Sequence, residues 1–374
     1  MIERRAVLRG ALSLAGGGAL WGGFGGPALS ACLGGSGSLA AGLLWPWEGG
    51  PREEIVAMRR LNPEYDLMAR LFLALALGDL AVSEPGRWKD RAIRALDAIL
   101  ADTDAAVADR GPAAFLLPYW GYANNRGPRR SLFVDGERLL ILAVRRFLGD
   151  APALRRAADD LSLAIREAMA GPAGSAESYP NECWTFCHSV ALAALHLGAA
   201  MGDRGGIPPW TTFARRSLRD PSGMLVSSFT WDGRVRDGPE GSSIWAASHL
   251  LRGVDPELAA EQYSLARAAL GRTAGGFGWA REWPVGDERT MDVDSGPLVP
   301  VLEASPSSSG LAILAARSAG DTGFERALRA SLEVGAFPRD AGGRRRFLAS
   351  NLVGDAVILA GTTAGPLWAA VGKA

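Results

Sequence analysis

The chain has 374 residues, with 40 basic and 40 acidic side chains and a hydrophobic fraction of 48%. Zero formal net charge and the absence of a basic cluster from the body of the chain argue against nucleic acid as a partner, because phosphate backbones select positively charged surfaces. The apolar fraction and twelve tryptophans suffice for a large core. We expect a small-molecule substrate, and self-association into a homo-oligomer is left open.

Residues 1–32 have the form of an export signal. Arg4 and Arg5 precede an uncharged run of Gly, Ala and Leu, as in twin-arginine signal peptides. The run ends in Leu29-Ser30-Ala31-Cys32, which resembles the bacterial lipoprotein box, in which the cysteine carries lipid. We therefore expect an exported protein, either periplasmic or tethered through a lipid anchor at Cys32; cleavage without lipidation is the alternative. Residues 33–54 are predicted to be a linker.

Residues 55–374 are predicted to form one all-α domain, an (α/α)6 toroid or barrel of six helical hairpins. Apolar residues recur at spacings of three and four, and short Gly, Asp and Pro connections separate the members of each pair. The longer connections between pairs are expected to form a pocket on one rim and to contain a few short strands, near residues 224–231 and 275–279. The predicted pairs are 64–82 with 87–106, 135–149 with 152–170, 182–201 with 209–218, 241–252 with 255–271, 307–319 with 322–334, and 350–361 with 365–372.

The segment from Glu177 to Ser189 gathers the most reactive side chains, at the predicted start of an apolar helix. The positive end of the helix dipole would lower the pKa of Cys183. The alternative is that both cysteines of the segment are small core residues. A spacing of one helical turn disfavours a disulfide, so free thiols are expected. Candidate residues here are Tyr179, Asn181, Glu182, Cys183, Cys187 and His188.

Further candidates lie on the other long connections and helix starts. Aromatic side chains on the first long loop would wall a pocket or cap the core, and Glu137 and Glu240 lie near predicted helix starts, where the dipole favours a carboxylate in any case. Ordinary helix caps and loop-fixing ion pairs are the alternatives. These candidates are Tyr119, Trp120, Tyr122, Glu137, Glu240, Trp245, Trp283, Asp292 and Asp294.

Cofactor motifs are missing from the sequence. The three histidines have no acidic or histidine partner at metal-ligand spacing, and the pair of cysteines lacks a second half, so no metal site is expected. Neither a dinucleotide-binding glycine motif nor a phosphate-binding loop occurs, so no nucleotide cofactor is expected either.

Two segments resemble the linalool dehydratase-isomerase family. They are Phe133-Val-Asp-Gly-Glu137, which leads into an apolar helix, and Ser178-Tyr-Pro-Asn-Glu182, which is followed by Cys187-His188. Pro180, Asn181 and Cys187 coincide with the family pattern, whereas Glu137 and Ser178 replace a histidine and a cysteine. The resemblance implies a six-hairpin barrel and a cofactor-free lyase or isomerase acting on a small apolar alcohol. Glu137 would then be the acid, with Cys187, His188 or Asp66 completing the proton exchange.

Two other functions fit the same predicted fold. An (α/α)6 glycoside hydrolase or polysaccharide lyase would use paired carboxylates, Glu137 or Glu240 with Asp292 or Asp294. A tethered binding protein without catalytic activity is the third hypothesis. Fold analogy alone does not distinguish them. A closed apolar pocket would favour the first function, and two carboxylates about 5 to 9 Å apart in an open groove would favour the second.

Overall fold

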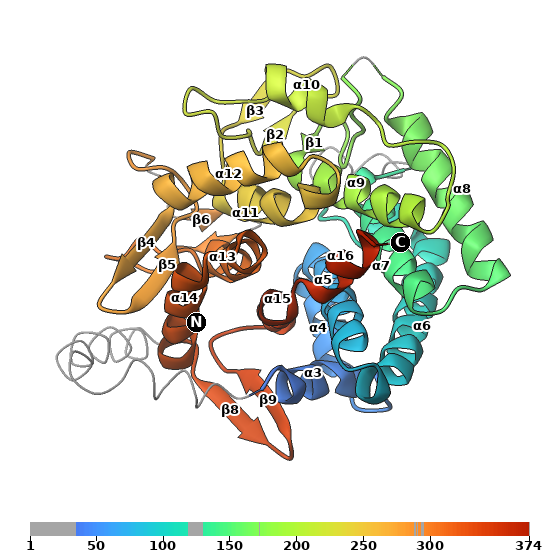
Figure 1. The fold of residues 1–374 in the computed structure, drawn as a ribbon, viewed down its shortest axis with the longest axis horizontal. Coiled ribbons are helices and arrows are strands. Elements are labelled where there is room, and N and C mark those ends of the chain that lie inside the picture. Colours follow the sequence, from blue (N-terminus) through green and yellow to red (C-terminus); the bar gives the residue numbers. More distant parts are fainter. Residues whose placement is uncertain are drawn as a thin grey trace.

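The computed structural model describes residues 35–118, 130–171, 173–287, 289, 291–292 and 295–373. Helices dominate these residues and form the predicted (α/α)6 toroid, in which an inner ring of helices is surrounded by an outer one (Figure 1). The inner helices are α5 (Pro63–Ser83), α7 (Leu132–Leu148), α9 (Thr185–Ala200), α11 (Gly241–Leu250), α13 (Pro306–Ala319) and α15 (Leu352–Thr363). The outer helices are α6 (Pro85–Arg110), α8 (Pro152–Ala168), α10 (Trp210–Ser217), α12 (Pro256–Ala269) and α14 (Thr322–Gly335). The last helix, α16 (Pro366–Val371), packs on α5 inside the ring, where Trp368 donates a hydrogen bond to His249 of α11 and stacks on His196 of α9.

Each inner helix packs against the next, and α15 packs against α5, which closes the ring. The inner helices are apolar around most of their circumference because they have neighbours on every side. Small residues allow the closest approaches: a Cβ on Gly136 of α7 would lie 3.2 Å from the Ala191 Cβ of α9. Likewise, a Cβ on Gly361 of α15 would lie 3.1 Å from the Leu314 nitrogen of α13. Larger side chains at these two positions would push the ring apart.

The inner helices begin at one rim of the toroid, and polar residues cap most of their starts. The Asn62 side chain accepts a hydrogen bond from the Glu64 nitrogen at 3.0 Å, which starts α5. Equivalent caps start α13, from Ser305, and α15, from Asn351. Such caps pair the first free N–H groups of a helix and fix the residue at which it begins. The side chains of each first turn therefore have defined directions.

Short strands occupy the long connections, as predicted. One sheet is three-stranded and antiparallel, in the order β1 (Cys183–Trp184), β2 (Ser228–Phe229) and β3 (Val235–Asp237). Three hairpins complete the set: β4 (Gly271–Ala274) with β5 (Phe277–Ala280), β6 (Met291–Asp292) with β7 (Gly296–Pro297), and β8 (Pro338–Ala341) with β9 (Arg344–Phe347). The last hairpin was not predicted, because its arginine-rich sequence lacks the apolar alternation of a half-buried strand.

The predicted linker at residues 33–54 contains a packed helix. Helix α3 (Ser36–Leu44) buries Leu39, Leu43 and Leu44 against β9 and α15. A Cβ on Gly42 would meet the Arg345 carbonyl oxygen at 2.5 Å, so the helix lies directly on the hairpin. A short 3-10 helix (Trp45–Trp47) and α4 (Glu53–Leu61) follow. The predicted export signal and Cys32 lie outside the described residues. Among the described residues, no helix has both the length and the apolar character that a bilayer crossing requires.

The buried carboxyl group of Asp79 links α5 to the start of α16. Asp79 of α5 is 2% exposed and accepts hydrogen bonds from the Gly365 and Leu367 nitrogens, at 3.1 and 2.8 Å, at the start of α16. Burial raises the pKa of Asp79 to about 7. The folded protein therefore binds this proton more tightly than the unfolded chain does.

We predict that Asp79 makes the protein less stable as pH rises. Its contribution is fully present below pH 3.8, the ordinary pKa of the group, and is lost as pH rises through about 7. Asp79→Asn keeps an acceptor oxygen and removes the charge. The free energy of unfolding of the variant should therefore lack this pH dependence, which is on the order of a few kcal/mol. Denaturant unfolding of both proteins between pH 4 and pH 8 measures the difference. Parallel pH curves for the two proteins would contradict this role.

Candidate active site

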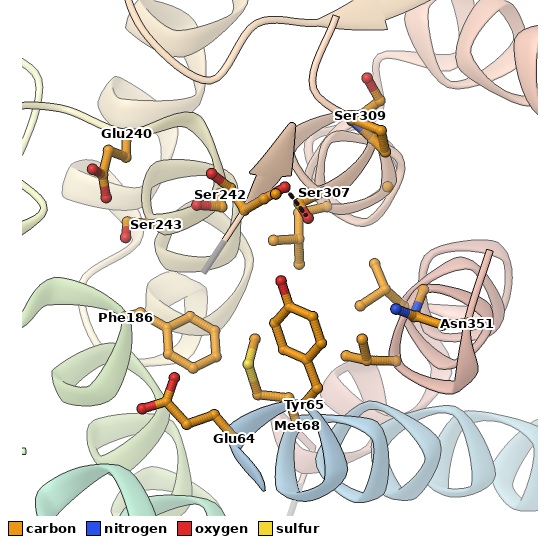
Figure 2. A pocket seen from close by; sticks show the side chains of 18 of the residues that line it. Glu64, Tyr65, Met68, Phe186, Glu240, Ser242, Ser243, Ser307, Ser309 and Asn351 are labelled. Carbon is orange, nitrogen blue, oxygen red and sulfur yellow. Dashed lines mark hydrogen bonds between the residues drawn. The ribbon is translucent and has the colours of Figure 1, made fainter. Parts of the chain in front are cut away.

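A cavity of about 600 Å³ lies at the N-terminal ends of the inner helices. This volume is within the range of about 300–1,000 Å³ that is typical of small-molecule sites. All six inner helices, or the residues that directly precede them, contribute to its lining. Its polar and aromatic lining residues include Glu64, Tyr65, Phe133, Ser178, Tyr179, Trp184, Phe186, Cys187, Glu240, Ser242, Ser243, Ser307, Ser309 and Asn351 (Figure 2).

Glu64 is one of two carboxyl groups that line the cavity among the described residues. It lies in the first turn of α5, beside Phe186 of α9 in the view of Figure 2, and is 8% exposed. The Tyr179 hydroxyl donates a hydrogen bond to Glu64 Oε1 and accepts one from the Leu117 nitrogen at 2.7 Å. Tyr179 therefore fixes the direction of the carboxyl group.

Glu137 is close enough to Glu64 to feel its charge, but it does not line the cavity. It is fully buried in the second turn of α7, and neither of its carboxyl oxygens has a hydrogen-bond partner among the described residues. Burial, and then the charge of Glu64, raise the pKa of Glu137 well above its usual value. Both effects favour the neutral, protonated form of Glu137.

Glu240 is the second carboxyl group of the lining. It directly precedes α11, is 6% exposed, and accepts a hydrogen bond from the Ser227 hydroxyl. Arg289 forms an ion pair with its Oε1 at 3.3 Å, and the guanidinium lies 4.7 Å from the centroid of the Trp283 ring. Trp283 thus supports the arginine that pairs with Glu240. Of these two candidates, Glu240 lines the cavity and Trp283 does not.

Asp66, the candidate from the segment that starts α5, does not line the cavity, whereas Glu64, which was not among the candidates, does. Asp66 faces away from the cavity, into an ion-pair network with Arg59 at 2.6 Å and Arg70 at 3.1 Å. Its role is to join α4 to α5. The sequence did contain a signal for Glu64, because Glu64 and Met68 are one helical turn apart and therefore lie on the same face of α5. In the structure, both line the cavity. The Asn62 cap fixes where that turn begins.

The two cysteines occupy different environments. Cys187 lines the cavity, in the first turn of α9. Cys183 precedes the helix and lies in β1, where it is fully buried. Burial raises the pKa of Cys183 to about 12, so the predicted lowering of its pKa is wrong. The charge of Glu177 adds to the effect of burial, and together they outweigh any effect of the helix dipole. Among the described residues, neither thiol belongs to a disulfide bond.

His188 is a core residue and does not line the cavity. Its Nδ1 lies 2.7 Å from the Trp184 carbonyl oxygen, and its Nε2 accepts a hydrogen bond from the Ala176 nitrogen at 3.1 Å. The ring stacks on Trp210, at 5.0 Å between centroids. Burial lowers the pKa of His188 to about 4. A neutral imidazole with both nitrogens engaged cannot act as an acid or a base on a substrate in the cavity.

Asn181, Glu182 and Trp245 do not line the cavity. Asn181 stands in the turn before β1 with a φ of 58°, and Glu182 pairs with Arg236 at 3.0 Å. Trp245 is fully buried, edge-on to Tyr263 of α12. The backbone of Asp292 lies in β6. Tyr119, Trp120, Tyr122 and Asp294 lie outside the described residues. Within the described part of the chain, no group of three or more His, Cys, Asp or Glu side chains could hold a metal ion.

Comparison with family models and with curated proteins found no match. Among solved structures, the chain is similar to a GH76 alpha-mannanase of Bacteroides thetaiotaomicron, with a TM-score of 0.50 and 13% sequence identity. The match covers 82% of this chain and 88% of that one. It confirms the (α/α)6 toroid, and at this identity it shows the fold alone.

The expected membership of the linalool dehydratase-isomerase family is wrong, as is the lyase or isomerase activity that it implied. The solved structure that shares the fold is a glycoside hydrolase. The proton exchange that the resemblance implied used Glu137 as the acid and Cys187, His188 or Asp66 as its partner. Cys187 lines the cavity, but Glu137 and His188 are buried in the core and Asp66 is held by two arginines.

We predict that His188 acts in stability alone. His188→Ala would leave the Trp184 carbonyl and the Ala176 N–H without their partner, so the free energy of unfolding should fall by about 3 to 5 kcal/mol. His196→Ala, at a half-buried histidine two turns further along α9, is the control and should cost less. In NMR spectra, the His188 ring should stay neutral from pH 8 to pH 5. A titration midpoint near 6.5 would contradict the assignment.

Proposed function

We propose that the protein is a glycoside hydrolase that cleaves a neutral glycoside, with Glu64 and Glu240 as its paired carboxylates. The observation that carries the proposal is their convergence: two nearly buried carboxyl groups from helices far apart in the sequence line one cavity. Glycosidic bond hydrolysis uses such a pair, one group as an acid and the other as a nucleophile or base. Similarity of the fold to a GH76 alpha-mannanase agrees with this proposal.

The surroundings of the two groups suggest different roles. Glu240 is already an anion in its ion pair with Arg289, which suits a nucleophile or base. Glu64 interacts with Glu137, whose burial favours the protonated form, so we assign the role of the acid to Glu64. In the proposed reaction, Glu64 donates a proton to the leaving oxygen while the bond from that oxygen to the anomeric carbon breaks. Water supplies the oxygen that finally bonds to the anomeric carbon, and its proton passes to a carboxylate.

The lining favours a neutral sugar over a uronate. Among the described residues that line the cavity, the charged ones are Glu64 and Glu240, and none is arginine, lysine or histidine. A substrate carboxylate would face two acidic side chains without a lining cation to offset them. Serine hydroxyls and aromatic rings, which sugars use for hydrogen bonds and stacking, are abundant there. This pattern favours hydrolysis over the polysaccharide lyase alternative.

We predict that Glu64→Gln and Glu240→Gln each lower kcat by about 100- to 10,000-fold on a neutral glycoside, since each removes a proton-transfer or nucleophilic group. Both substitutions keep the size of the side chain and an acceptor oxygen. The activity would be found with a panel of p-nitrophenyl glycosides and neutral oligosaccharides, with uronate oligosaccharides alongside. Glu325→Gln is the matched control, because Glu325 is also 8% exposed but lies on α14. Unchanged kcat in either cavity variant would refute the pair.

We predict a different outcome for Glu137→Gln. Because burial favours the neutral form of Glu137, the amide should preserve folding and keep kcat within about tenfold of the wild type. Thermal unfolding and steady-state kinetics with the same glycoside would check both expectations. A loss of kcat as large as that of Glu64→Gln would mean that Glu137 itself transfers the proton. The role of the acid would then belong to Glu137 and not to Glu64.

A further inference from the structure

The cavity has two chemically different sides. Glu240, Ser242 and Ser243 of the α11 start lie together on one side, above Phe186 and Glu64 in the view of Figure 2. Asn351, which caps α15, lies on the opposite side of the cavity in the same view. Phe186 belongs to α9, which is separated from α15 by two helices in either direction around the ring. The starts of α9 and α15 therefore face each other across the cavity.

The side formed by α13, α14 and α15 combines polar helix starts with aliphatic side chains. Ser307, Ser309 and Asn351 line it at the starts of α13 and α15, and its aliphatic part includes Leu311, Leu332, Val353, Val357 and Ile358. Val353, Val357 and Ile358 are on α15, and Leu332 reaches the cavity from α14 of the outer ring. Apolar side chains from three helices therefore form an aliphatic wall in this part of the cavity.

A purely polar substrate would fit this wall poorly. A hydroxyl group that is moved from water to an aliphatic surface without a hydrogen-bond partner loses free energy, so a second sugar unit would be disfavoured there. An alkyl or similar apolar group would instead gain from burial, at about 25 cal/mol for each Å² removed from water. Near Glu240, Ser242 and Ser243, by contrast, serine and carboxyl oxygens offer hydrogen-bond partners to sugar hydroxyls.

We propose that the substrate is an amphiphilic glycoside, whose sugar lies between Glu64 and Glu240 and whose aliphatic aglycone lies against Val353, Val357 and Leu332. This inference rests on the proposed hydrolase function and assigns its leaving-group subsite. Cleavage would release the aglycone as an alcohol. Its oxygen keeps the bonding electrons and takes the proton from Glu64, while water provides the new hydroxyl of the sugar.

The test compares methyl, butyl and hexyl glycosides of one sugar, the sugar turned over in the p-nitrophenyl panel, below micelle-forming concentrations. We expect kcat/KM to rise about threefold for each methylene added, on the order of 100-fold from methyl to hexyl. Val353→Thr and Val357→Thr keep the side-chain shape but add a hydroxyl group, and should remove most of this rise. Val371→Thr is the matched control, because Val371 is buried in α16 outside the cavity.

A third variant tests the same aliphatic wall in case the two threonine variants misfold. Leu332→Phe should fill the aliphatic side, so hexyl glycosides should lose affinity while methyl glycosides keep theirs. Turnover that is independent of chain length, or a rise that the threonine variants leave intact, would overturn the inference while the hydrolase proposal stands. If no glycoside is turned over, calorimetric binding of methyl and hexyl glucopyranosides decides the subsite alone. If affinity rises with chain length and the threonine variants remove that rise, the result supports the subsite without the hydrolase. If affinity does not rise with chain length, the proposed subsite is overturned.

Discussion

Closure of the inner ring, through the packing of α15 on α5, is the constraint on which the rest of the structure depends. Glu64 and Glu240 are 176 residues apart in the sequence and come from helices that are not neighbours in the ring. They share a cavity because every inner helix begins at the same rim. Small residues such as Gly136 and Gly361 bring adjacent helices close enough for the ring to close. An open stack of the same hairpins would leave the helix starts as separate surfaces.

Burial in the toroid also determines which ionisable groups can act on a ligand. Glu137 and His188 have reactive side chains, but both are buried in the core, and burial favours the neutral form of each. Asp66 is buried too and is held by arginines in a structural network. Among the described residues, Glu64 and Glu240 are the carboxyl groups that are nearly buried and still reach the cavity. Access to the cavity therefore distinguishes the candidate site from the other ionisable residues.

Much of the fold could be predicted from the sequence, because helix periodicity and capping are local. All twelve helices of the toroid were predicted, and most of their ends were within three residues of the observed ones. The site was harder to predict, since reactive residue types do not reveal which face of a helix they occupy. Glu64 and Asp66 are two residues apart and point in different directions, and Cys183 was placed on a helix although it lies in a strand. The short motifs behind the family resemblance carried too few positions to identify the chemistry.

The central claim is that ring closure places a neutral sugar between Glu64 and Glu240. A crystal structure of the Glu240→Gln variant with a glycoside that the wild-type protein cleaves would test it most directly. We expect the sugar in the cavity, with its glycosidic oxygen within about 3 Å of a Glu64 carboxyl oxygen. A sugar bound on another surface, or one in the cavity whose glycosidic bond lies beyond the reach of Glu64, would contradict the account.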